Sequence, residues 1–211
     1  MESSVADLDA FLDRTADERL ADFLDLIRIP SIGTQSEHAA DMVATAQLVA
    51  DRLEKMGFEH VEVSDTGGHP MVYADWLHAE GAPTVLVYAH YDVQPVDPLD
   101  LWNKPPFDPV VADGRVWARG AADDKSHVHI HMWAARAWLE TRGKLPINMR
   151  IVMEGEEEGG SDHFEPWIVA NKHRLSADMA VVSDCGFHEG NLPALTSGLR
   201  GLIYAQIDVT G

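Results

Sequence analysis

Residues 84–92 read TVLVYAHYD, an apolar run that ends in two ionisable side chains, His90 and Asp92. The β-branched and aromatic residues of this run predict a buried strand over 84–89. Residues two apart in an extended chain face the same way, so His90 and Asp92 should point together beyond the strand. A metal-binding histidine usually has a carboxylate that fixes its orientation. A histidine satisfied within a turn is the alternative, and this tripeptide alone leaves both open.

Outward from this strand, the chain alternates between amphipathic and short apolar segments. Helices are predicted over 5–28, interrupted near Thr15, and over 38–56, 125–141 and 162–173. Strands are predicted over 61–64, 71–76, 84–89, around Val116, and over 148–153 and 179–183. This alternation indicates the α/β class, with a mixed, partly parallel sheet flanked by helices. Two further strands, 192–198 and 202–209, are predicted with a turn between them.

The composition excludes several classes of partner. The formal net charge of −19 over 211 residues disfavours nucleic acid and anionic membranes, because both require a cationic face. The N-terminal residues are acidic and no apolar run reaches the roughly 18 residues of a membrane span, so we expect a cytoplasmic protein. The single cysteine, Cys185, excludes an internal disulfide and is expected to be buried and inert.

Polar clusters follow three other predicted strands. Asp123 and Asp124 stand at a strand-to-helix turn; one could cap the helix, which leaves the other free to bridge two cations. Residues 154–161 read EGEEEGGS, and so dense a run of glutamates needs either solvent or cations to offset its repulsion. Asp184 ends the strand 179–183 and is weak evidence by itself. All the clusters lie where α/β sheets place their sites, and a histidine with several carboxylates suits zinc, manganese or cobalt.

Six ordered motifs carry a resemblance to a known family. They are HYDVQP at 90–95, LWNKPPFDP at 101–109, RVWARGAADDK at 115–125, EGEEEGGS at 154–161, VVSD at 181–184 and LTSGLRGL at 195–202. With these motifs the chain resembles the M20 metallopeptidases, in particular the branch of cytosolic non-specific dipeptidases and carnosinases. The resemblance implies hydrolysis of the peptide bond of dipeptides or short peptides.

The resemblance also implies a centre of two divalent ions, most readily zinc, with manganese or cobalt as alternatives. Its expected protein ligands are His90, Asp123, Glu158 and Asp184. Asp123 would bridge both ions, Asp92 would orient His90, and Glu157 would act as the general base. The family pattern further implies a cis peptide bond between Asp123 and Asp124.

Family members are about twice as long as this chain, and full-length members are expected to be homodimers. We therefore expect residues 1–198 to be the N-terminal part of the catalytic domain and residues 199–211 to begin a truncated lid or dimerisation domain. One metal position would then have three protein ligands. The second would have only Asp123 and Glu158, because its C-terminal histidine lies beyond this chain. We expect tight binding of at most one ion and little or no dipeptide hydrolysis.

Two other functions remain open at this point. The same scaffold could remove acyl groups from amino acids, or the chain could be a non-catalytic metal-binding module. The presence of Glu157 argues against a pure binding module, which has no need of a general base. His127, His129 and His131 alternate along a predicted helix, and we expect them not to share one face as ligands would.

Overall fold

The computed structural model describes residues 5–186, 192, 194–196 and 198–210. Its helices are α1 (Ala6–Arg14), α2 (Ala16–Arg28), α3 (Ala39–Met56), α4 (Lys125–Arg142) and α5 (Phe164–Asn171). Its strands are β1 (Glu59–Ser64), β2 (Met71–Trp76), β3 (Thr84–His90), β4 (Val110–Ala112), β5 (Arg115–Trp117), β6 (Asn148–Glu154) and β7 (Met179–Val182). Three short 3-10 helices include η3 (Glu157–Gly159). None of the described helices is both long and apolar enough to span a bilayer.

The central sheet has the strand order β1-β2-β6-β3-β7. β2 runs antiparallel to β1 and to β6, whereas β3 runs parallel to both β6 and β7. The prediction of a mixed, partly parallel sheet flanked by helices is confirmed. Parallel pairing brings the carboxyl ends of β3, β6 and β7 to one edge of the sheet, and His90 lies directly opposite Glu154 in the register.

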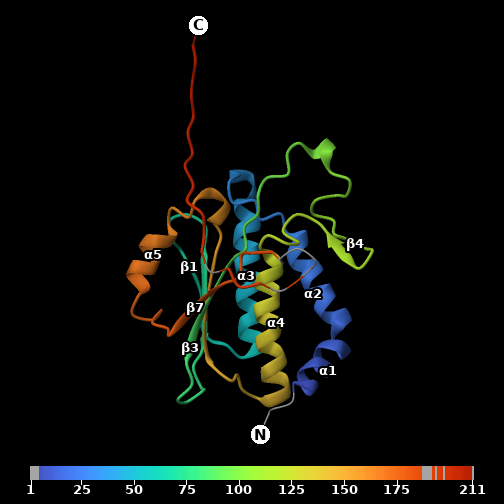
Figure 1. The fold of residues 1–211 in the computed structure, drawn as a ribbon, viewed down its shortest axis with the longest axis vertical. Helices are drawn as coiled ribbons and strands as arrows, with labels where there is room; N and C mark the ends of the chain where they lie inside the picture. Colours follow the sequence, from blue (N-terminus) through green and yellow to red (C-terminus); the bar gives the residue numbers. More distant parts are fainter. Residues whose placement is uncertain (1–4, 187–191, 193, 197, 211) are drawn as a thin grey trace.

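The two faces of the sheet are covered by different helices (Figure 1). Alternate residues of β2 and β6 separate to the two sides because side chains in a strand alternate. Val72 and Ile151 belong to the larger core, which the apolar sides of α3 and α4 complete. Tyr73 and Val152 face the other side and pack with Trp167 of α5.

The N-terminal helices form a second layer over α4. The break predicted near Thr15 separates α1 from α2, and the Thr15 hydroxyl donates to the Phe11 carbonyl at 2.7 Å. Leu8 and Phe11 of α1 pack against Trp133 of α4. This layer fixes α4, whose first turn lies beside the predicted site.

The C-terminal segment differs from its prediction. Residues 198–210 form no helix or strand; they are exposed and extend away from the sheet (Figure 1). The strand predicted over 202–209 is therefore wrong for this structure, because an extended segment becomes a strand only when a neighbouring strand accepts and donates its backbone hydrogen bonds. Of the predicted strand 192–198, positions 193 and 197 lie outside the described residues, and the others show only a bridge residue at Leu192. A domain boundary near residue 198 stays a prediction.

Candidate metal centre

Five backbone elements converge on one group of side chains. His90 ends β3, Asp184 follows β7 by two residues, and Glu157 and Glu158 begin η3 after β6. Asp123 lies before α4, and its peptide bond to Asp124 is cis, as the family resemblance implied. Residues that are far apart in the sequence thus meet because the sheet brings the carboxyl ends of its parallel strands together.

His90 is at the centre of this group. Its side chain is completely buried, and Nε2 lies 3.1 Å from Asp123 Oδ1, 3.7 Å from Asp184 Oδ2 and 3.8 Å from Glu157 Oε2. Despite these neighbours, Nε2 has no hydrogen-bond partner among the described residues. A buried polar atom without a partner is costly unless it binds something else, and imidazole nitrogen facing carboxylate oxygens is a donor set that suits zinc. The residues present therefore fit a divalent metal ion.

Asp92 is also completely buried, and it connects His90 to the acidic loop. Its Oδ1 lies 3.2 Å from His90 Nδ1, and its Oδ2 accepts a hydrogen bond from the Glu158 backbone N–H at 3.0 Å. The two side chains point together, as the spacing of the sequence predicted. A carboxylate on Nδ1 favours the tautomer that leaves the Nε2 lone pair free for a metal.

Asp124 holds the backbone of His90, a role that the sequence did not predict. It makes no side-chain cap of α4; its Oδ2 accepts the His90 backbone N–H at 3.0 Å, and its Oδ1 contacts His127 Nδ1. The side chain is completely buried. Asp124 therefore holds the end of β3 against the start of α4, while Asp123 remains directed at His90. The pair of adjacent aspartates indicated that one side chain has a role beyond metal binding. Capping of α4 was the simpler prediction for it.

The structure does not bring all the predicted metal ligands into one group. Ligand atoms of His90, Glu157 and Asp184 lie within 4.8 Å of one another, so the predicted general base is inside the tightest group. Asp123 approaches His90 but its side chain is 60% exposed. Glu158 lies to one side, where its Oε2 accepts a hydrogen bond from Gln94 Nε2 at 2.5 Å.

Burial, together with crowding of like charges, raises the pKa values of three carboxyl groups at the centre. Burial is the main cause for Glu157, Glu158 and Asp184, and the negative charges of their neighbours raise each pKa further. Burial opposes protonation of His90, but the hydrogen bond to Asp92 and the surrounding carboxylates outweigh it and raise the pKa of the imidazole to about 10. The site is thus a region of strongly negative potential in which a cation is favoured.

Glu156 anchors the acidic loop and was not predicted. Its carboxylate accepts the backbone N–H of His69 at 2.9 Å and that of His163 at 3.1 Å, and it also contacts the His163 ring at 3.0 Å. The second glutamate of the run therefore points away from the centre into hydrogen bonds of its own. No sequence pattern distinguished it from its neighbours, because its partners come from distant segments.

The helical histidines only partly follow the prediction. His129 is buried beside Phe23 and Trp133, on a different side from the other two. His127 contacts Asp124 and His131 contacts Ser183 at 2.7 Å, so these two share a side near the centre. The expected separation was wrong for this pair, since residues four apart lie on one face of a helix. Cys185 is exposed rather than buried.

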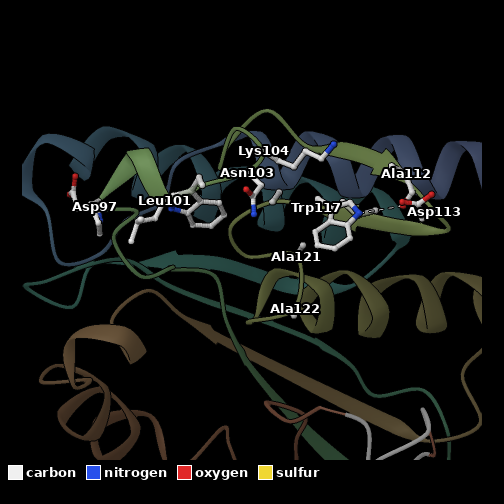
Figure 2. Close-up of a pocket in the computed structure, with 13 residues that line it drawn as sticks. Asp97, Leu101, Asn103, Lys104, Ala112, Asp113, Trp117, Ala121 and Ala122 are labelled. Carbon is white, nitrogen blue, oxygen red and sulfur yellow. Dashed lines mark hydrogen bonds between the residues drawn. The ribbon is translucent and has the colours of Figure 1, made fainter.

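A cavity of about 720 Å³ adjoins the segment before Asp123. Figure 2 shows Trp117, Leu101 and Lys104 along its wall, with Ala121 and Ala122 nearest to the helix α4. Ala121 and Ala122 also line a second hollow, which contains Asp123 and Asp184. The two spaces are therefore neighbours that share these two residues in their lining.

Comparison with known proteins shows to which family the chain belongs. The model of peptidase family M20/M25/M40 matches residues 86–197, which include every residue of the candidate centre. This chain belongs to that family. The match covers more than half of the described chain and spans the strands whose ends carry the site.

Individual M20 relatives agree with this assignment. The chain is 32% identical to the Cys-Gly metallodipeptidase dug1 of Schizosaccharomyces pombe, over all of this chain and 47% of the relative. It is 33% identical to the Beta-Ala-His dipeptidase of Mus musculus, over 77% of this chain and 35% of the relative. The solved structure of human carnosine dipeptidase 1 superposes with a TM-score of 0.81 at 27% identity, over 87% of this chain and 41% of that one. The chain thus spans less than half the length of each of these M20 proteins.

Proposed function

We propose that this chain supplies the water-activating part of a metal-dependent dipeptidase. The observation that carries the proposal is His90 Nε2, which is buried, faces three carboxylates and has no hydrogen-bond partner in the described part of the chain. The names of the relatives, Cys-Gly and Beta-Ala-His dipeptidases, support dipeptides as the substrate class. Zinc is the proposed ion because imidazole and carboxylate are its common ligands.

The proposed ligands form two metal positions, one with three protein ligands and one with two. His90, Asp123 and Asp184 would hold one ion, while Asp123 and Glu158 would contribute to a second. Asp92 would keep His90 in the metal-binding tautomer through the contact with Nδ1. Because we assign two protein ligands to the second position, against three for the first, we expect it to bind zinc more weakly. Homodimerisation stays a prediction.

Glu157 is the proposed general base. It lies at the centre but is 37% exposed on its side chain, so water can reach it. It would take a proton from the attacking water and pass it to the amine nitrogen as the peptide C–N bond breaks. When bound, the divalent ions polarise the scissile carbonyl and make water more acidic.

The test separates the roles of Glu157 and the ligands. Glu157→Gln should keep zinc affinity within a fewfold of the parent while removing any hydrolysis of Cys-Gly or β-Ala-His dipeptides. Asp184→Asn should weaken zinc binding as well. Glu165→Gln, at an exposed position of α5, is the matched control and should change neither measurement. Equal loss of zinc affinity and hydrolysis in Glu157→Gln would favour a non-catalytic metal-binding module.

A second function is favoured by one relative. The chain is 28% identical to the succinyl-diaminopimelate desuccinylase of Thioalkalivibrio sulfidiphilus, over 78% of this chain and 44% of the relative. That name describes removal of an acyl group, which the same residues could perform on an N-acyl amino acid. A panel of dipeptides and N-acyl amino acids distinguishes the two, and preference for the acyl compounds would replace the dipeptidase proposal.

A further inference from the structure

A second group of potential metal ligands lies on β1 and β2. Atoms of Glu59, His60 and Asp75 that could bind a metal lie within 4.8 Å of one another. His78 lies beside the group, with its Nε2 3.2 Å from Glu59 Oε2. Asp75 pairs with Arg150 near the start of β6, whereas His90 pairs with Glu154 at its end. The group therefore lies toward the opposite end of the sheet from the His90 centre.

An irregularity in β1 brings two consecutive side chains to the same place. Glu59 is paired with Asp75 and Glu62 with Tyr73, so the register shifts between them. His60 adopts the left-handed region, with φ of 50°. In a regular strand consecutive residues point to opposite faces, and a bulge re-aims one of them. Here both Glu59 and His60 reach Asp75.

Asp75 is the fixed member of the group. It is only 5% exposed, its Oδ2 accepts a hydrogen bond from the Tyr73 hydroxyl at 2.8 Å, and its Oδ1 lies 2.9 Å from His60 Nδ1. A carboxylate held on one oxygen by a neighbouring hydroxyl is a typical arrangement around a metal ligand. The side chains of His60 and Glu59 are 70% and 52% exposed, so an ion can enter from solvent.

The charges in the group also favour a cation. Among the described residues, Glu59 and Asp75 form ion pairs only with histidines, which bind metals when neutral. Arg150 lies opposite Asp75 on β6, but its guanidinium donates to the Ser176 carbonyl and makes no ion pair with Asp75. A tetrahedral zinc ion places its oxygen and nitrogen ligands roughly 3.4 Å apart. The His60–Asp75 contact of 2.9 Å is close to this spacing, and the ligand atoms of all three residues lie within 4.8 Å of one another.

We propose that Glu59, His60 and Asp75 form a second, solvent-accessible binding site for zinc. The site ties the start of β1 to the end of β2 and is separate from the His90 centre. Zinc bound there stabilises the edge of the sheet, because an ion that binds only the folded state adds to its stability. The competing description is a simple ion pair between a protonated His60 and Asp75, to which zinc would add nothing.

The test counts zinc ions bound to the 211-residue chain by competition with a chromophoric chelator. His60→Ala and Asp75→Asn should each bind one equivalent fewer than the parent. Glu59→Gln leaves the His60–Asp75 contact in place and should lower the zinc affinity of this site about tenfold or more. Tyr73→Phe should lower it similarly by removing the hydrogen bond to Asp75, since partners of metal ligands are worth about 10- to 100-fold in affinity. His38→Ala is the matched control: His38 also contacts an aspartate, Asp41, at 2.7 Å, but belongs to no ligand group among the described residues.

A spectroscopic measurement identifies where the ion binds. Zinc should shift the imidazole nitrogen resonances of His60 in the parent, and should still shift them in His90→Ala. The thermal midpoint of each variant without zinc shows that it is folded. The proposal is overturned if His60→Ala and Asp75→Asn keep the zinc stoichiometry of the parent, or if the His60 resonances respond to pH but not to zinc.

Discussion

The Asp92 carboxylate accepts a hydrogen bond from the backbone N–H of Glu158 at 3.0 Å, and this bond joins the end of β3 to the acidic loop after β6. The other oxygen of the same carboxylate faces the His90 ring. One buried side chain therefore sets the orientation of the imidazole and the position of the loop at once. Changes to it should affect binding of a metal more than they affect folding.

Asp92→Asn tests this double role. The amide keeps the shape of the side chain but loses its charge, so it holds the His90 ring less strongly in the metal-binding tautomer. We expect zinc affinity at the His90 centre to fall about 10- to 100-fold. Competition titration with a chelator measures the loss, and Asp100→Asn, at an exposed position, should leave the affinity unchanged. An unaltered affinity in Asp92→Asn would show that the contact does not orient the ligand.

Gly155→Ala tests the close packing beneath the acidic loop. A Cβ at this position would lie 2.6 Å from the Tyr91 ring and 2.8 Å from Met42 Cε. Tyr91 is fully buried and donates to the Pro70 carbonyl, so it has little room to move. We expect a loss of about 1–3 kcal/mol in the free energy of unfolding, with weaker zinc binding because the loop that carries the proposed ligand Glu158 shifts. Gly201→Ala, where a Cβ meets no atom within 4 Å, should be neutral in denaturant unfolding.

Lys125→Met tests a buried cation at the start of α4. The side chain is completely buried, and Nζ donates to the carbonyls of Leu26 at 3.1 Å and Ile29 at 2.6 Å. Methionine fills similar space but leaves both carbonyls at the end of α2 without this donor. We expect a loss of roughly 2–3 kcal/mol in stability, and a melting temperature lower by about 5–10 °C. The same change at exposed Lys144 is the control; equal melting temperatures for both variants would contradict the prediction.

His129 should make the stability depend on pH. Burial lowers the pKa of its imidazole to about 4, with the charges of Arg52 and Arg19 adding to the effect. The unfolded chain, with an ordinary pKa near 6.5, then binds more protons between pH 4 and 6.5, so stability is present above this window and is lost as the pH falls through it. The loss from this residue is at most roughly 3 kcal/mol.

The measurement for His129 is the free energy of unfolding in urea at several pH values. His129→Phe keeps an aromatic ring beside Phe23 and Trp133 and removes the titrating group. The difference between the parent and this variant should grow with pH between 4 and 6.5. His173→Phe, at an exposed position, should show no such pH-dependent difference. A constant difference for His129→Phe would mean that the ring is not held neutral by burial.

Much of the fold could be predicted from the sequence because its signals are local. The apolar run 84–89 became β3, Gly57 ends α3 in the left-handed conformation, and the interruption near Thr15 separates α1 from α2. The segment 202–209 shows the limit of such signals. Its alternating pattern is that of a strand, but no strand forms in the described structure, because pairing depends on a partner and not on the segment itself.

For the candidate centre, the sequence by itself determined that His90 and Asp92 lie together and that carboxylates follow several strands. Only the tertiary structure decided that Glu157 lies closer to His90 and Asp184 than Glu158 does, that Asp124 holds His90 rather than capping α4, and that Glu59, His60 and Asp75 meet at all. The reason is physical. Periodicity and spacing fix which way neighbouring side chains point, whereas contacts between distant residues follow from the order, direction and register of the strands, which depend on how the whole core packs.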